Sequence, residues 1–585
     1  MTESNSSRKV PAQQPVQQNK PQRTISRQSI RTVLIYAFAL AASCIAITQL
    51  IFPAHFETVD DINFTLLLSG VGLTHTPVYM TWFTNVLITY PLMLLFKCMP
   101  NVAWYSIYLF SVLTASFTIF AAAFMLRFNL KIGAALFLIY YVSVGALVLN
   151  GLQYTSAAAL LTQAGFLLAC CLPLAKRFPT KRFPAWIIVV SVIATVLASM
   201  IRFEPFMLVI LFCSITTLSV APGRLDFIKR NAKPLCWFAI AVIIGVTLKT
   251  ANNLYYDTQP AYAGVRDLFK PFSDIADSDR VYKGSKKPKW SENDYALVKQ
   301  FFVADRDVFT TDALSLAVKE SEIPFTTKKL QWVFETEILP VLLLCLGAAW
   351  FLNIKIMGKK RLVVWTSGIV LLILYLAFFM KLPTRVHLTL LTCTMTTLFM
   401  FMDRAKLKRI SQNFQHADNT KRILSYIVAA SLAGWLTYST TSRLHEETAF
   451  YKDEGTRIVE SIRMLNPQPG QLFVVLGTAT PYQYMLPFQN LRTTFSRFDI
   501  YRTSLWGRLP LGYNMLENHG IGSLLVACKS QNVFFISNAK TNELFAKFCS
   551  EHYQSNAVFT HEFGDPKSDF NVYRVKLKPQ IRSES

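Results

Sequence analysis

The chain has 585 residues, of which 52% are hydrophobic and only 16% are charged. This composition excludes an ordinary soluble enzyme and is typical of a protein that crosses a membrane several times. Its formal net charge of +24 does not indicate nucleic-acid binding, because the Lys and Arg residues gather in short clusters between apolar runs, as they do where a membrane protein fixes its orientation.

The N-terminal segment, residues 1–31, is rich in Gln, Pro, Ser and basic side chains. It has too few apolar residues to build a core, so we expect a disordered basic arm. The run at 32–53 is too long for the core of a signal peptide and lacks a convincing small-residue cleavage site. We therefore expect it to be retained as a membrane anchor.

Ten further apolar runs have a length close to the ~20 residues that a hydrocarbon core of ~30 Å requires. They lie at 102–126, 132–150, 156–174, 184–201, 204–221, 235–251, 336–354, 362–380, 386–402 and 422–440. One more run, at 78–97, has two interpretations. It is either another span or an amphipathic helix at the membrane surface with Trp82, Tyr90 and Phe96 as interfacial anchors.

The positions of the basic residues favour the surface helix, because short cytoplasmic loops carry an excess of Lys and Arg. If 78–97 does not cross, the N-terminal arm and the later basic clusters all fall on one side. Those clusters lie at 127–131, 176–182, 224–233, 355–361 and 404–422. This orientation gives about eleven transmembrane helices in a domain at 32–440, with the N-terminus cytoplasmic. We expect the protein in the bacterial inner (plasma) membrane.

Three segments then face away from the cytoplasm: a first loop at 54–101 with its juxtamembrane helix, a large loop at 252–335, and a terminal domain at 441–585. In the large loop, 273–290 is expected to be irregular and 292–309 partly helical. The terminal domain is predicted to be α/β, with strands at 471–478, 522–528, 532–537 and 571–578 and a helix at 541–553. The fold class is therefore an α-helical polytopic membrane protein with a C-terminal extracytoplasmic α/β domain.

The cysteines predict no metal site, since most of the ten lie inside apolar runs and none forms a CxxC pair. Cys528 and Cys549 lie in the polar terminal region. A disulfide between them requires an oxidising compartment, and the sequence leaves that question open.

Ionisable and polar residues at the outward ends of the spans form a candidate site, because such groups are costly to desolvate. They are Asp60, Asp61, Tyr154, Arg202, Glu204, Lys381, Arg385 and His387. Carboxylates and fixed cations on one rim suit a reaction in which a base activates a hydroxyl while a phosphate is held. Arg202 and Arg385 are the expected phosphate binders, since a guanidinium forks onto phosphate oxygens.

Each of these features also has a purely structural interpretation. The two acids at the start of a helical LLL run fit helix capping. Arg202 and Glu204 fit an ion pair at a tight turn, and the histidines fit the rim of a membrane domain. The combination, more than any one residue, points to a site.

The order of these elements resembles the GT-C superfamily of membrane glycosyltransferases, which includes protein mannosyltransferases and aminoarabinose transferases. The matching residues are the pair Asp60-Asp61 after the first span and the stretch HTPVYMTWF at 75–83, which is similar to the segment leading to the juxtamembrane helix in that group. Here the second acid is Asp where many members have Glu, and Thr-Pro stands where others have Pro-Pro.

The resemblance implies inverting transfer of a sugar from a polyprenyl-phosphate carrier to a hydroxyl of a glycan, lipid or protein acceptor on the outer face. Asp60 would be the catalytic base and Asp61 its acidic companion. Some members need a divalent cation such as Mg, Mn or Ca, and the two acids could hold one, but two ligands do not establish a site. The alternatives are a transporter or flippase, with charges lining a pathway near the midplane, and a noncatalytic assembly protein for surface polysaccharide.

Overall fold

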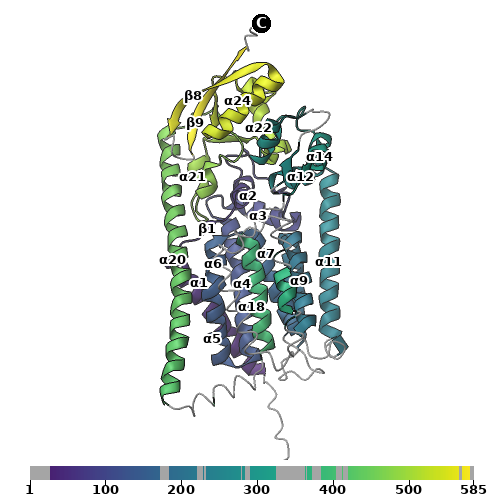
Figure 1. Ribbon diagram of the computed structural model, residues 1–585, viewed down its shortest axis with the longest axis vertical. Coiled ribbons are helices and arrows are strands. Elements are labelled where there is room, and N and C mark those ends of the chain that lie inside the picture. The colour runs from purple at the N-terminus through teal and green to yellow at the C-terminus, as the bar shows by residue number, and fades with distance from the viewer. Residues whose placement is uncertain are drawn as a thin grey trace, which may run out of the picture.

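The computed structural model describes residues 27–171, 184–220, 228–229, 232–278, 280–283, 290–324, 363, 365–371, 374, 384–402, 412, 419–564 and 570–579. Within them, long apolar helices stand side by side and a small sheet domain lies at one end of the bundle (Figure 1). The predicted fold class, a polytopic helical membrane protein with a C-terminal α/β domain, is confirmed. The expected span at 336–354 and most of that at 362–380 lie outside the described residues.

The bundle helices follow the apolar runs closely. They are α1 (Arg27–Ile51), α4 (Trp104–Arg127), α5 (Leu130–Tyr140), α6 (Ala146–Asn150), α7 (Tyr154–Phe166), α8 (Ala185–Ile201), α9 (Phe203–Val220), α11 (Ala232–Asp257), α18 (Thr384–Phe401) and α20 (Asn419–Leu465). A π-helical turn, Tyr141–Gly145, joins α5 to α6, so the run at 132–150 is one continuous element. Helix α4 buries Phe117, Phe120 and Phe124 completely at the centre of the bundle.

The ambiguous run at 78–97 forms only α3 (Val86–Cys98), a helix of 13 residues. That is too short to cross a hydrocarbon core, which needs ~20 residues. The helix is preceded by an irregular segment at 70–85 and begins at Asn85, whose side chain accepts a hydrogen bond from the N–H of Leu87. The surface-helix interpretation therefore agrees with the length of this element.

The first loop also contains α2 (Val59–Ser69), which starts directly after a short strand, β1 (His55–Phe56). Strand β1 pairs in parallel with β2 (Gly151–Leu152), so the foot of the first span is joined to the start of α7. Helix α2 ends at Gly70, which has a positive φ of 70°. A side chain there would meet the ring of Pro77, so only glycine fits this turn.

The terminal domain is a five-stranded mixed sheet in the order β6-β5-β7-β9-β8. Its strands are β5 (Leu472–Val475), β6 (Asp499–Arg502), β7 (Val533–Ile536), β8 (Ser555–Gly564) and β9 (Asn571–Pro579). The strands expected at 471–478, 532–537 and 571–578 are present, and the helix expected at 541–553 is α24 (Ala539–Tyr553). The strand predicted at 522–528 is wrong: a serine cap at Ser523 starts a short helix there, α23 (Leu524–Ala527).

The large loop is built into the terminal domain. Its helices are α12 (Pro260–Ala276), α13 (Glu292–Lys299) and α14 (Thr311–Lys319), so part of the segment predicted to be irregular is helical. Phe302 packs edge-on against Phe545 and Phe548 of α24, and Phe309 stacks on Phe548, in one buried cluster. Cys528 and Cys549 lie in the same cluster as free thiols.

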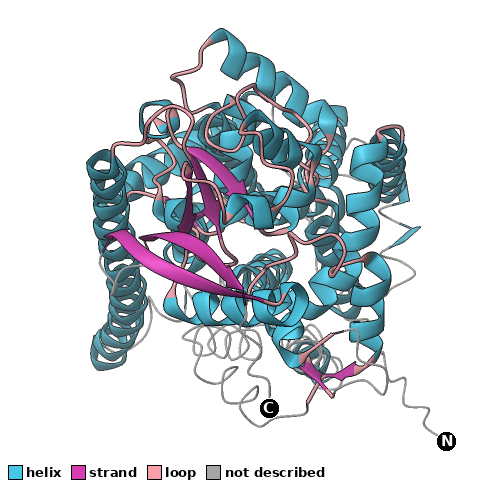
Figure 2. Ribbon diagram, turned by 90° about the horizontal axis from the view of Figure 1, so that it is seen from above, coloured by secondary structure: helices cyan, strands magenta, loops and turns pink. Residues whose placement is uncertain are grey.

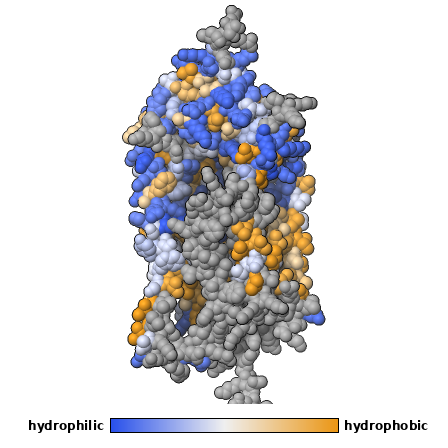
Figure 3. All heavy atoms as spheres, in the orientation of Figure 1, coloured by the Kyte–Doolittle hydropathy of each residue, from blue (hydrophilic) through white to orange (hydrophobic). Residues whose placement is uncertain are grey.

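One continuous helix leads from the bundle to the terminal domain, since α20 runs for 47 residues from Asn419 to Leu465. Residue 441, the expected start of the domain, lies inside this helix. Seen from above, the strands lie over the ring of helices (Figure 2). The visible face is mostly hydrophilic around the sheet domain, and apolar side chains gather lower down along the helices (Figure 3).

Candidate functional site

A cavity of about 270 Å³ lies where the bundle, the two loops and the sheet domain meet. Its wall combines α2, the segment after it, the turn between α8 and α9, α12, the first turn of α18 and the end of β6. The polar residues that line it are Asp60, Arg202, Ser273, Asp277, Arg385, Arg502 and Ser504. Aromatic side chains, among them Trp82, Phe83 and Trp506, form most of the remaining surface.

Asp60 is the carboxylate of α2 that faces this cavity. Among the described residues its side chain makes no hydrogen bond, although three arginines carry charge close to it. Burial raises the pKa of Asp60, while Arg202, Arg502 and Arg385 act in the opposite direction. Within the described part of the chain, the Asp60 carboxyl thus has no hydrogen-bond partner and lies near three guanidiniums and the carboxyl of Asp277.

Asp61 has a different environment, since it is fully buried and its oxygens are occupied. Oδ1 accepts hydrogen bonds from the hydroxyl of Tyr105 at 2.8 Å and from the backbone N–H of Tyr154 at 3.1 Å. Oδ2 accepts one from Thr58 at 2.8 Å. Tyr154 is the first residue of α7, so Asp61 caps a helix that is remote in sequence. The capping interpretation is therefore wrong for α2, whose N-cap is Thr58 and has no side-chain hydrogen bond. Asp61 caps α7 instead.

Arg202 lies in the turn between α8 and α9, and its guanidinium reaches the cavity. Its Nη1 donates to the hydroxyls of Tyr154 at 2.7 Å and Thr155 at 2.6 Å, and the group lies over the rings of Phe83 and Tyr154. Glu204 forms a 3.5 Å ion pair with Nε, but its side chain is 62% exposed and does not line the cavity. Of the predicted pair, Arg202 belongs to the site and Glu204 lies outside it.

The predicted residues near the start of α18 also differ in whether they line the cavity. Arg385, in the first turn of α18, lines the cavity. His387 is buried in that helix and is not part of the cavity wall. Lys381 lies outside the described residues.

Arg502 is a cavity residue that sequence reasoning missed. It ends strand β6, it is buried, and its Nη2 donates to Thr480 at 3.0 Å. No motif surrounds it in the sequence, and the strand that carries it was not predicted. The parallel pairing of β6 with β5, and the hydrogen bond from Ile500 N–H to the carbonyl of Gly72, bring this arginine to the membrane domain.

Two cavity residues have a strained backbone. Trp82 and Phe301 are two of the four non-glycine residues with positive φ in the described part of the chain, at 72° and 61°. Such conformations cost ~1–3 kcal/mol and persist where the surrounding structure enforces them, often at functional sites. At Trp82 the hydroxyl of Tyr256 accepts the backbone N–H at 2.9 Å and so holds the residue in place. Trp82 belongs to the HTPVYMTWF stretch that the sequence had already singled out.

Glu57 is a second residue that was missed. Burial raises its pKa to about 7, and Arg385 opposes the shift both by its charge and by a backbone hydrogen bond to the carboxylate. Glu57 therefore anchors the start of α18, as Asp61 anchors the start of α7. Glu57 and Asp61 thus bind the first turns of two helices, whereas Asp60 lines the cavity.

These contacts do not fit a divalent cation between Asp60 and Asp61. The oxygens of Asp61 already accept three hydrogen bonds, and three arginines supply the positive charge near Asp60. A cation would have to displace those donors and approach three guanidiniums.

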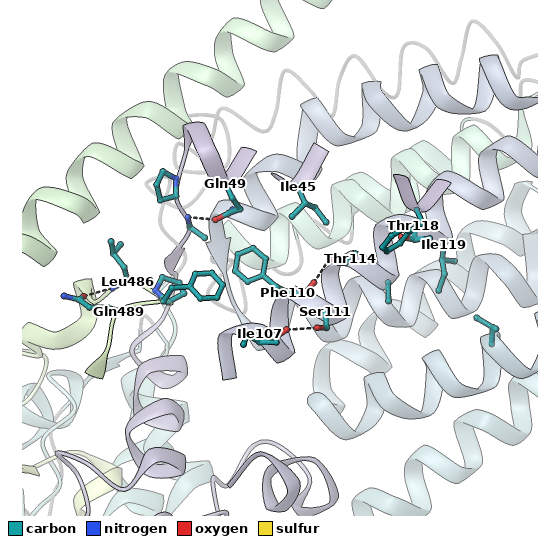
Figure 4. Close-up of a pocket in the computed structure, with 17 residues that line it drawn as sticks. Ile45, Gln49, Ile107, Phe110, Ser111, Thr114, Thr118, Ile119, Leu486 and Gln489 are labelled. Carbon is teal, nitrogen blue, oxygen red and sulfur yellow. Dashed lines mark hydrogen bonds between the residues drawn. The ribbon is translucent and has the colours of Figure 1, made fainter. Parts of the chain in front are cut away.

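A second and larger cavity, of about 1280 Å³, is lined by residues of α1, of α4 and of the segment at 486–489. Figure 4 shows Ile45 and Gln49 of α1 facing Ile107, Phe110 and Thr114 of α4. The segment at 486–489 closes one end, where the hydroxyl of Ser106 donates to Pro487 at 2.5 Å. Most of the surface is apolar. Its volume exceeds the ~300–1,000 Å³ of ordinary small-ligand pockets.

Comparison with known proteins gives structural similarity only. No family model matches the chain, and no curated protein matches it. The chain is similar to the crystal structure of ArnT from Cupriavidus metallidurans in the apo state, with a TM-score of 0.48, 11% identity, and coverage of 93% of this chain and 98% of that one. It is also similar to ArnT from the same organism bound to undecaprenyl phosphate, with a TM-score of 0.34, 10% identity, and coverage of 95% and 99%.

Proposed function

We propose that the protein is a membrane glycosyltransferase that moves a sugar from a polyprenyl-phosphate donor to an acceptor hydroxyl. The observation that carries the proposal is the cavity at Asp60, in which one carboxylate without a hydrogen-bond partner among the described residues faces the guanidiniums of Arg202, Arg385 and Arg502. A base for a hydroxyl and a cationic surface for a phosphate leaving group are the two requirements of this reaction.

In the proposed reaction the acceptor hydroxyl gives its proton to Asp60 while its oxygen bonds to the anomeric carbon of the sugar. The bond from that carbon to the phosphate oxygen breaks, and the electron pair leaves with the phosphate. The arginines stabilise this growing negative charge. A single displacement of this kind inverts the anomeric configuration. The raised pKa of Asp60 favours it as a base, because a catalytic base works best when its pKa approaches the operating pH.

The aromatic residues and the second cavity suit the other parts of such a donor. The rings of Trp82, Phe83 and Trp506 offer apolar faces to a sugar beside Asp60. The apolar cavity between α1 and α4 suits a long isoprenoid chain, since it is larger than a sugar requires and has few polar groups. With the basic clusters on the cytoplasmic side, this end of the bundle would face outward, and the acceptor would be a glycan, lipid or protein of the cell envelope.

The same geometry opposes a transporter. The charged residues gather in one cavity at the sheet-domain end of the bundle, where α2 and α3 lie (Figure 1). A pathway through the membrane would instead place them near the middle of the spans.

The test compares cell-envelope glycans of three strains: a deletion strain, an Asp60→Asn strain, and an Asp312→Asn strain as the matched control. Asp312 is an exposed carboxylate in the first turn of α14. We expect the deletion and Asp60→Asn to lose the same sugar, because removing a general base costs ~10²–10⁴ in rate. Asp312→Asn should keep it. Normal glycan with Asp60→Asn at wild-type expression would exclude Asp60 as the base.

A further inference from the structure

A cluster of two histidines and one aspartate lies outside the proposed active site, where the first loop meets the sheet domain. His75 belongs to the irregular segment after α2, Asp499 begins strand β6, and His519 directly follows α22 (Pro510–Asn518). The Nε2 atom of His75 lies 3.2 Å from one oxygen of Asp499, and Nε2 of His519 lies 3.0 Å from the other. All three potential ligand atoms lie within 4.8 Å of one another.

The hydrogen bonds of His519 indicate that a cation belongs at this point. Its Nδ1 lies 3.2 Å from the carbonyl oxygen of Gly470, while its Nε2 faces the carboxylate of Asp499. Both neighbours are acceptors, but a neutral imidazole has only one N–H. When Nδ1–H donates to Gly470, the lone pair of Nε2 points at a carboxylate, which is unfavourable unless a positive ion lies between them. A histidine that ligates a metal has this arrangement, with its other N–H donated to a backbone carbonyl.

The distances also suit a metal ion. Tetrahedral zinc binds histidine nitrogen and carboxylate oxygen at ~2.0–2.2 Å, which places adjacent ligand atoms ~3.3 Å apart. The two observed separations, each to a different oxygen of Asp499, are close to that value. The side chain of His519 is 8% exposed, that of Asp499 20% and that of His75 50%. The cluster is therefore buried at His519 and open to solvent at His75.

We propose that His75, Asp499 and His519 bind one zinc ion, with water in the fourth position. Two imidazoles and one carboxylate are ligands that zinc favours, and three protein ligands leave an open position. The inference stands apart from the proposed transfer reaction, because none of the three residues lines the Asp60 cavity.

The ion would fasten the first loop to the edge of the sheet. These segments already touch, since the N–H of Ile500 donates to the carbonyl of Gly72 at 2.9 Å. Both continue to the cavity: the loop carries Trp82, and β6 ends at Arg502, three residues or ~10 Å beyond Asp499. The zinc ion would therefore set the spacing between an aromatic wall of the cavity and one of its arginines.

A second cluster, formed by Asp294, Glu551 and His552, has a similar composition but a different explanation. Asp294 completes a capping box with Ser291 at the start of α13 and accepts a hydrogen bond from His552. Its atoms are used by the helix end, so it serves as the matched control.

The experiment measures zinc bound to the full-length protein, purified in detergent without a histidine tag and dialysed against ZnCl₂. We expect one zinc per chain in the wild type and in His552→Ala. In His75→Ala and His519→Ala we expect an affinity lower by more than ~100-fold, since even second-shell changes cost 10–100-fold. Cobalt(II) should give the visible absorption bands of a low-coordinate site in the wild type and in His552→Ala, and not in His75→Ala or His519→Ala. Circular dichroism of each variant verifies folding.

Equal zinc content in the wild type, His75→Ala and His519→Ala would overturn the proposal. So would a wild-type unfolding temperature that does not respond to zinc at constant pH. If His519→Ala fails to fold, His75→Ala decides the question, since the more exposed residue can be removed with less effect on packing.

Discussion

Asp61 offers a quantitative test of how the site is held, through the variants Asp61→Ala and Asp61→Asn. Alanine leaves the hydroxyl of Tyr105 and the N–H of Tyr154 buried without an acceptor. Each such donor costs ~1–3 kcal/mol, so the two together cost about 2–6 kcal/mol of unfolding free energy. The hydroxyl of Thr58 is left out of this sum, because it is half-buried and can turn to another partner.

Asparagine should be much milder. Its oxygen can keep the hydrogen bonds from Tyr105 and Tyr154. Its NH₂ group can donate to the Thr58 hydroxyl, which is the donor in the wild type. The free energy of unfolding then falls by about 1–2 kcal/mol, because two hydrogen bonds to a charged oxygen become bonds to a neutral one. The cost of burying the Asp61 charge is removed at the same time. The predicted order of stability is wild type and Asn close together, with Ala far below.

The pH dependence gives an independent measurement of the same residue. Burial raises the pKa of Asp61 from 3.8 to about 7, against its three hydrogen bonds. A carboxyl whose pKa is raised on folding contributes stability that is complete below its unfolded pKa and is lost as pH rises through the folded value. The wild type should therefore lose stability between about pH 4 and 7, and Asp61→Asn should lack this component.

Thermal unfolding of the purified protein in one detergent, followed by intrinsic fluorescence at several pH values, provides the assay. Equal stability of the Ala and Asn variants would refute the account, because the two differ in whether the buried donors have an acceptor. An identical pH slope in the wild type and Asp61→Asn would show that another group is responsible.

Two further predictions concern the charged residues around the cavity. Arg502→Gln should move the acid limb of the pH–rate profile of sugar transfer to higher pH, because Arg502 lowers the pKa of Asp60 and a base must be ionised to act. The control is Arg492→Gln, which changes an exposed arginine. An acid limb that stays in place in Arg502→Gln would contradict this prediction. Glu204→Gln should keep transfer within about twofold of the wild type, since an exposed ion pair contributes little; a tenfold loss would place Glu204 in the site.

Where the structure describes the chain, the apolar helices follow the predicted runs, because an apolar run of fixed length is a local signal. The sequence also selected Asp60, Arg202 and Arg385, which line one cavity, since ionisable residues at span ends are rare. It did not separate Asp60 from Asp61, because the difference lies in Tyr105 and Tyr154, which are 44 and 93 positions away from Asp61. Pairing over such distances leaves no trace in neighbouring residues.

Other parts of the site were beyond sequence reasoning for similar reasons. Arg502 and Glu57 acquire their roles from strand pairing and from a helix end far away in the chain. The stretch at 522–528 was predicted as a strand because its apolar run is short, and a short run of that kind fits a strand or a helix equally well. The serine cap was the signal that should have decided for the helix.

The unbroken course of α20 gives the sheet domain a mechanical link to the bilayer. A helix of 47 residues is ~70 Å long, so a tilt of 5° at its membrane end displaces the far end by about 6 Å. Spans adjust their tilt to the thickness of the surrounding lipid. A change in the tilt of α20 would therefore move β5, the next strand along the chain, and with it β6, which pairs with β5 and carries Arg502.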